Sequence, residues 1–177
     1  MTYNFDNSKA INLLLYVLEK AGGETDFLTI FKTLYFADEK HLSRYGRLIT
    51  GDWYAALPFG PAPSGIYDIL KAVRGDSPFL SEPFSSYFSI ENRYNVVASS
   101  KPDLDELSES EIECLDESIK ENVGLDFNTL SKKSHGPAWT AANANGEISI
   151  NEIAKEGGAS SEMIKYILSN CENLSIA

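Results

Sequence analysis

The sequence predicts an α+β fold that is predominantly α, in which a helical bundle carries one small β-hairpin. Apolar residues recur at helical spacing through most of the chain, whereas the alternation typical of strands is convincing only over residues 88–98. Hydrophobic residues make up 43% of the chain and charged residues 23%, which is typical of a globular protein. A chain of 177 residues can bury a substantial core, so we expect a folded domain.

Two helices are predicted in the first 46 residues. An apolar stripe over residues 11–18 indicates the first helix, which the sequence Ala21-Gly22-Gly23 should end. The second should begin near Thr25, whose side chain suits an N-cap, and Gly46 should end it in a left-handed conformation.

Residues 50–74 predict a turn, an extended segment and a third helix. Because the segment 53–63 is short and includes three prolines, we expect it to be extended but without regular structure. Pro61 and Pro63 then favour the start of a helix over residues 64–74, since proline fits a first helical turn.

The rest of the chain predicts the hairpin and several helices. Ser108 and Glu111 form a capping box before a helix that Gly124 should end, and short helices follow near residues 127–130 and after Pro137. Ser149 with Glu152 predicts a further capping box, ahead of two short helices separated by two glycines. We expect a first unit over 1–155 and a C-terminal helical extension over 156–177 that packs on the same domain.

The charge distribution argues against a nucleic acid partner. The net charge is −11, and residues 101–126 alone hold ten acidic and two basic residues. An acidic chain is poorly suited to a phosphate backbone, because that affinity depends on cations. We interpret the acidic segment as a solvated helix face.

No membrane span, cofactor site or metal motif is predicted. The longest apolar run, residues 13–18, is far shorter than a spanning helix, and no signal peptide is indicated at the N-terminus. Cys114 and Cys171 are too few for a disulfide framework. We therefore expect a soluble, cytoplasmic protein.

Asp38 and His41 interrupt the apolar stripe of the second helix. The spacing of three places both on one face, and a buried charge there must find a partner or water. They could be an acid–base pair, half of a metal site, or a satisfied core network that holds the loop after Gly46; we favour the core network. We expect the Asp38 carboxylate to be buried, with hydrogen bonds from His41 or from the turn at residues 50–53.

Residues 53–63 combine aromatic residues and prolines, which is unusual. Rigid segments lose little entropy on binding, and aromatic residues are favoured anchors of protein interfaces, so this segment is a contact surface or a core plug, and both can hold for different faces of it. One glycine, Gly60, cannot form a phosphate-binding loop. If the segment is an interface, Tyr54 and Tyr67 are better anchors than Trp53, because a phenol tolerates one wet edge. The acidic face over 103–126 is the second candidate.

Residues 34–67 resemble the Panacea domain, also described as SocA-like or GepA-like. The resemblance lies in the order and spacing of residues 34–42, 45–47, 49–52 and 57–67, with weaker likeness at 130–139 and 148–153. It covers roughly residues 8 to 155. The motif positions are Asp38, His41, Tyr45, Gly51, Pro58, Gly60, Pro61 and Tyr67.

The resemblance implies an antitoxin. Panacea-domain proteins are encoded beside diverse small toxins and neutralise them by direct contact, and relatives occur on phages and mobile elements. SocA itself also acts as an adaptor that delivers its toxin to the ClpXP protease. The expected partners are thus a cognate toxin and a cellular protease.

Two rival functions come from other classes. Ile153, Ala154, Gly158 and Ile164 have helix-turn-helix spacing, which would fit a DNA-binding autorepressor using residues 150–169, although the second helix offers one cation, Lys165. A hydrolase would require Asp38, His41 and His135 to converge in a cleft. No nucleophile with an adjacent base is evident, so we do not expect an enzyme.

Overall fold

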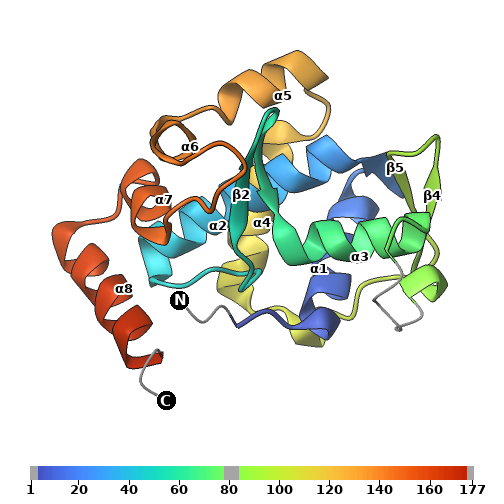
Figure 1. The fold of residues 1–177 in the computed structure, drawn as a ribbon. Helices are drawn as coiled ribbons and strands as arrows, with labels where there is room; N and C mark the ends of the chain where they lie inside the picture. The colour runs from blue at the N-terminus through green and yellow to red at the C-terminus, as the bar shows by residue number, and fades with distance from the viewer. Residues whose placement is uncertain (1–3, 78–83, 175–177) are drawn as a thin grey trace.

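The computed structural model describes residues 4–77 and 84–174 and confirms the predicted α+β, predominantly helical class (Figure 1). Over these residues the helices are α1 (Asn7–Lys20), α2 (Phe27–Tyr45), α3 (Ser64–Arg74), α4 (Glu109–Asn122), α5 (Phe127–Lys133), α6 (Pro137–Ala141), α7 (Ile150–Glu156) and α8 (Ser161–Leu174). The strands are β1 (Glu24–Asp26), β2 (Tyr54–Leu57), β3 (Gly60–Pro63), β4 (Phe88–Glu91) and β5 (Asn95–Ala98). None of the described helices is long and apolar enough to cross a membrane.

Helix α2 is the central element, and thirteen of its nineteen residues are buried. It is contacted by α4, by the β2–β3 hairpin, by α5 and by α7, so neighbours cover it on several sides (Figure 1). Burial on several sides explains why α2 departs from a simple amphipathic stripe, and why polar residues such as Lys32 and Thr33 are also buried.

Two apolar cores meet at α2. The larger joins its N-terminal half to α1, α3, α4 and the β4–β5 hairpin. The smaller joins Tyr35, Phe36 and Leu42 of α2 to α6, α7 and Ile167 of α8. Helix α8 lies at one edge of the molecule and is held mainly through α7 (Figure 1).

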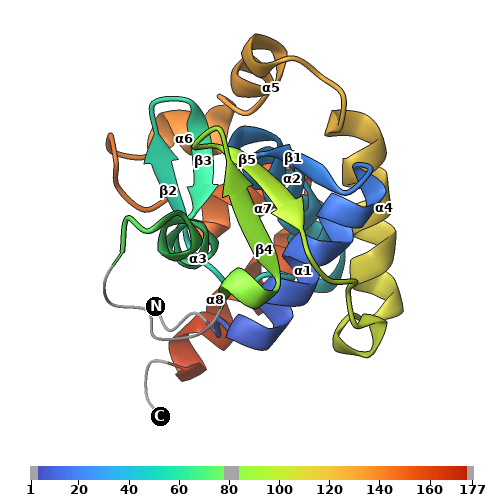
Figure 2. The same ribbon diagram turned by 90° about the vertical axis from the view of Figure 1, so that its right-hand side faces the viewer.

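The predicted hairpin at residues 88–98 is confirmed, with Ile90 paired to Val96 across β4 and β5. The sequence did not predict β1, whose three residues pair with β5 to complete an antiparallel sheet in the order β1-β5-β4 (Figure 2). Three residues are too few for a detectable alternation.

Residues 54–63 form a second hairpin, which corrects the expectation of irregular structure. Strands β2 and β3 make a two-stranded sheet with a two-residue turn, Pro58-Phe59. Residues 145–148 bond to the other side of β2, but β3 is an edge strand, so the prolines at 61 and 63 can occupy it without removing a ladder hydrogen bond that the sheet needs.

The predicted helix ends are partly right. Gly46 ends α2 in the left-handed conformation, and the capping box of Ser108 and Glu111 is present. Thr25 is not the N-cap of α2: it belongs to β1, and the Asp26 carboxylate accepts from the Thr29 amide at 3.0 Å. The second predicted capping box is also wrong, because Glu152 accepts from Lys155 and Ser149 makes no side-chain cap.

Candidate partner-binding site

Asp38 is fully buried and binds the loop that follows α2. Its carboxylate accepts from the Ile49 amide (2.5 Å), the Thr50 amide (3.2 Å), the Thr50 hydroxyl (2.5 Å) and the Tyr54 hydroxyl (2.7 Å). Burial raises the pKa of Asp38 to about 6, although these hydrogen bonds act in the opposite direction. The predicted burial and the predicted bonds from the turn are therefore confirmed.

His41 does not bind Asp38, which corrects the alternative of a shared pair. Its Nδ1 lies 2.9 Å from the Arg47 carbonyl oxygen and its Nε2 lies 3.1 Å from the Ser110 hydroxyl. A carbonyl can only accept, so Nδ1 carries the proton in this arrangement and Nε2 accepts from Ser110. Burial lowers the pKa of His41, which favours this neutral form.

Asp52 was not selected from the sequence, yet it holds the other end of the loop. It is buried and accepts from the amides of Trp53, Gly65 and Ile66 at 2.8–3.0 Å. The last two amides belong to the first turn of α3, whose own N-cap, Pro63, offers no side-chain acceptor. Asp38 and Asp52 together fix both ends of the segment that leads into β2.

Two motif glycines lie where a side chain would not fit. At Gly51, φ is +60° and a Cβ atom would lie 2.4 Å from the Asn4 carbonyl oxygen. At Gly60, φ is +99° and a Cβ atom would lie 2.2 Å from Ser134 Oγ and 2.9 Å from Lys32 Nζ. Both positions favour glycine through conformation and through close packing.

The remaining motif residues divide into buried and exposed positions. Tyr54 is only 1% exposed, and its hydroxyl donates a hydrogen bond to Asp38, so the prediction that it anchors an interface is wrong. Pro61 is also buried. Tyr45 and Pro58 are exposed, and Trp53 and Tyr67 are half-buried. The sequence could not separate these classes, because β2 and β3 are buried almost throughout and show no alternation of buried and exposed residues.

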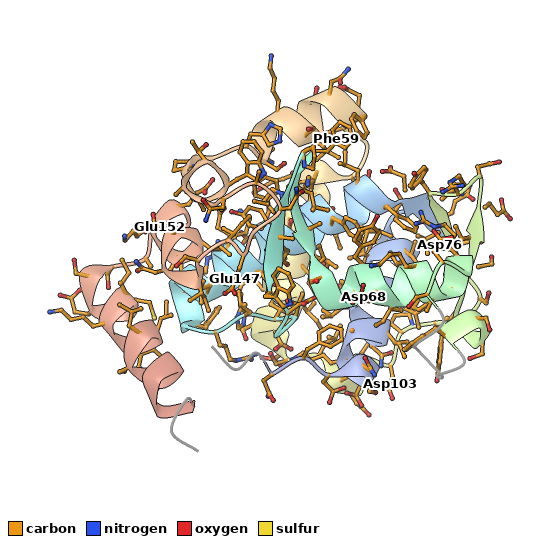
Figure 3. All side chains as sticks on the ribbon, in the orientation of Figure 1. Phe59, Asp68, Asp76, Asp103, Glu147 and Glu152 are labelled. Carbon is orange, nitrogen blue, oxygen red and sulfur yellow. The ribbon has the colours of Figure 1, made fainter. Side chains whose placement is uncertain are left out.

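The tip of the β2–β3 hairpin presents an exposed aromatic pair. The side chain of Phe59 is 58% exposed and that of Phe127 is 49% exposed, and their rings meet edge-on at 5.1 Å. Phe59 projects from the hairpin tip beside α5 (Figure 3). The Trp139 indole donates to the Leu57 carbonyl at 3.0 Å and the Ser131 hydroxyl to the Phe59 carbonyl at 3.3 Å, so the tip is held in place.

A pocket of about 510 Å³ begins at this aromatic pair and follows the N-terminal half of α2. We call it the α2 groove; its walls include Phe27, Phe31, Leu57, Phe59, Tyr67, Tyr94 and Phe127. Lys32 also lines it, although the side chain is 1% exposed. Phe127, Tyr94 and Lys32 were not predicted as site residues, because no local pattern distinguishes them from core or solvent positions.

The acidic segment is not simply a solvated face. Glu111 of α4 is buried and accepts from Lys9 and Arg47 at 2.5 Å, and Arg44 of α2 binds both oxygens of Glu117 at 2.7–2.8 Å. Burial opposes the ionised form of Glu111, yet the hydrogen bonds from Lys9, the Ser108 amide and Arg47 lower its pKa to about 2. Part of the negative charge thus docks α4 onto α1 and α2.

His135 is not joined to Asp38 and His41. Its ring stacks on Trp139 with centroids 4.0 Å apart, while Asp38 and His41 are occupied by the contacts given above. Among the described residues, no group of three acidic, histidine or cysteine side chains could hold a metal ion.

The predicted helix pair near the C-terminus is formed by α7 and α8. Ile153 and Ala154 are buried where the helices approach, and Gly158 has a φ of +81° in the turn between them. On α8, Glu162 and Lys165 are both exposed. This arrangement fits any tightly packed helix pair and is not specific to DNA binding.

Comparisons with known proteins agree with the motif residues. Comparison with curated proteins gives no significant match, and neither does comparison with solved structures. A family model described as antitoxin SocA-like, Panacea domain, matches residues 30–140, which is more than half of the chain. The matched range includes α2, the β2–β3 hairpin and α5, the elements that build the site. The chain therefore belongs to the SocA-like antitoxin family with a Panacea domain.

Proposed function

We propose that this protein is the antitoxin of a toxin–antitoxin pair and neutralises its cognate toxin by forming a stable complex. It acts by binding and not by catalysis, in the cytoplasm, and it also serves as an adaptor that presents the toxin to a protease such as ClpXP. Membership of the SocA-like family supports the antitoxin role, and the exposed Phe59–Phe127 pair supports binding at the hairpin tip.

The contact surface keeps the segment around Trp53–Tyr67 that the sequence favoured, but its anchor residues change. Because Tyr54 is buried, Phe59 and Phe127 replace it as the anchor residues. Tyr67 and Tyr94 line the α2 groove next to them. Exposed aromatic side chains are unusual on a surface and are enriched among residues that dominate binding energy. The hydrogen bonds to Leu57 and Phe59 hold the tip before binding, which reduces the entropy lost on association.

The test is co-expression with the protein encoded by the adjoining reading frame. We expect wild-type protein to restore growth and to co-purify with that protein, and the double variant Phe59→Ala, Phe127→Ala to weaken the complex at least tenfold, or about 1.4 kcal/mol. Leu168→Ala is the control, because Leu168 is 40% exposed on α8, outside both candidate surfaces. Full rescue by the double variant would move the interface elsewhere, with the acidic face over 103–126 as the next candidate.

The adaptor role has its own test. In cells that express both proteins, the toxin should disappear faster after protein synthesis is stopped when ClpX is present than when it is deleted. A toxin half-life that does not depend on ClpX would reject the adaptor role while leaving neutralisation by binding intact.

A further inference from the structure

Lys32 is a buried cation without an acidic partner in the described part of the chain. Its ammonium group donates to the Pro61 carbonyl at 2.7 Å, and its side chain is 1% exposed. An ammonium group has three donors, and this backbone acceptor satisfies one of them. Burial alone lowers the pKa of Lys32 to about 7, with no neighbouring carboxylate opposing the shift.

The position of Lys32 connects it to the α2 groove. It follows Phe27 and Phe31 on the face of α2 that lines the groove, and its Nζ lies beneath Gly60 at the base of the hairpin tip. Aromatic residues lie on either side: Phe27 packs with Tyr94 at 5.7 Å, and Phe59 packs with Phe127 at 5.1 Å. Aromatic side chains thus lie at both ends of the groove, Asp26 also lines it beside Phe27, and Lys32 in its wall has no acidic partner among the described residues.

The other charged groups beside the Phe27 and Tyr67 end of the groove already have partners, whereas Lys132, near Phe59 and Phe127, is exposed to solvent. Asp26 caps α2 through Thr29, Lys71 binds Asp68 at 2.5 Å and Arg74 binds Asp76 at 2.6 Å. Lys71 and Arg74 also lie over the rings of Tyr67, Phe27 and Tyr94. Lys32 is therefore the charge whose environment would improve most if a carboxylate entered, since an unpaired buried ion is costly.

We propose that the α2 groove binds an apolar segment of the partner protein that carries an internal aspartate or glutamate, and that this carboxylate pairs with Lys32. Apolar walls lie on both sides of Lys32. A segment that carries its carboxylate on an internal side chain can contact both walls, whereas a segment that ends in a C-terminal carboxylate would contact one wall and leave the other uncovered. The inference rests on the proposed function for the identity of the partner, but the chemistry of the groove can be tested without it.

The test uses a display library of short linear peptides fused at their C-termini, so that the peptides present internal acids and no terminal carboxylate. A chain of net charge −11 should by itself select basic peptides. We expect wild-type protein to enrich peptides with one acidic residue between apolar residues, and Lys32→Met to lose the acidic residue while keeping the apolar ones. Lys165→Met is the control, because Lys165 is exposed on α8 away from the groove, and it should select as wild type does.

A selected peptide is then titrated against isotope-labelled protein at about pH 6.5, below the pKa of Lys32. Chemical shift changes should cluster at the groove, and replacing the acid by its amide should weaken binding about tenfold in wild type but less than twofold in Lys32→Met. The proposal is wrong if no acid is enriched, if Lys32→Met selects the same peptides, or if the shift changes lie outside the groove. A variant peptide that carries the amide in place of the internal acid and ends in a free C-terminal carboxylate is compared with the selected peptide. If the variant peptide binds more tightly, the group that pairs with Lys32 is a terminal carboxylate and not an internal side chain.

The two proposals fail separately. Binding of the adjoining gene's product that groove peptides do not compete with would reject the groove and keep the antitoxin. Groove peptides that bind as expected, without any complex with that product, would reject the antitoxin and keep the groove.

Discussion

The buried carboxylate of Asp38 gives the first test at the scale of single residues. Asp38→Leu removes the acceptor for two amides and two hydroxyls, from Ile49, Thr50 and Tyr54. Unsatisfied buried donors are costly, so we expect a loss on the order of 3–5 kcal/mol in the free energy of unfolding. Urea unfolding measures this, with the exposed Asp105→Leu as control; equal midpoints for both variants would contradict the structural role.

Lys32 makes a prediction about pH. The folded-state pKa is lowered to about 7, below the ordinary value of 10.5, so the unfolded chain holds more protons between these values. Wild-type stability should therefore rise with pH across that window, since the cost of the buried charge is present in full only below it. Lys32→Met should be more stable than wild type by about 1–3 kcal/mol near pH 6, and the gain should disappear towards pH 10.

Urea unfolding of wild type and Lys32→Met at about pH 6, 8 and 10 checks this sign. A difference that stays constant with pH would mean that the amine is charged in the folded state throughout. Lys71→Met, at a half-buried lysine that is paired with Asp68, should show no comparable trend.

The turn of the β2–β3 hairpin gives a test at the scale of secondary structure. Gly60 and Gly124 both have positive φ, +99° and +93°, but a Cβ atom meets neighbouring atoms only at Gly60. Gly124→Ala should cost about 1 kcal/mol through conformation alone, and Gly60→Ala about 1–3 kcal/mol more through the clash with Ser134 and Lys32. Thermal unfolding of the two variants separates the two causes. Equal losses of stability would show that the hairpin can shift to accommodate the added methyl group at no cost.

Sequence patterns predicted elements well where periodicity is undisturbed. Helices α3 and α4 and the β4–β5 hairpin follow the predicted stripes, because each buries one face. Helix α1 was also predicted, although all of its residues from 10 to 18 are buried. The β2–β3 hairpin was not predicted as strands, because its strands are short, contain prolines and are buried on both faces, so they show no alternation. Of the site, the network around Asp38 could be predicted because a charge in an apolar stripe must find partners. Lys32 could not, because a lysine is usually solvated and long-range packing decides its burial.

For the whole molecule, net charge decides between protein and DNA as the partner. The chain carries −11, and the exposed surface of α8 includes Glu162 as well as Lys165, so few cations are available for phosphates. We expect no sequence-specific shift of the DNA upstream of its own gene at micromolar protein and near-physiological salt. A specific shift that Lys165→Ala abolishes would favour the autorepressor instead.

Because α2 belongs to both cores, it limits where the chain boundaries of family members can be placed for expression and library work. A fragment limited to the matched residues 30–140 begins inside α2 and omits α1, α7 and α8. It would uncover Leu34 and Tyr35 of α2, which are 0–1% exposed in the whole chain. Such a fragment should aggregate, since large apolar side chains would face solvent along the central helix. Chimeras between relatives should therefore exchange only the hairpin tip and α5, and should keep α2 together with the flanking helices of the same protein.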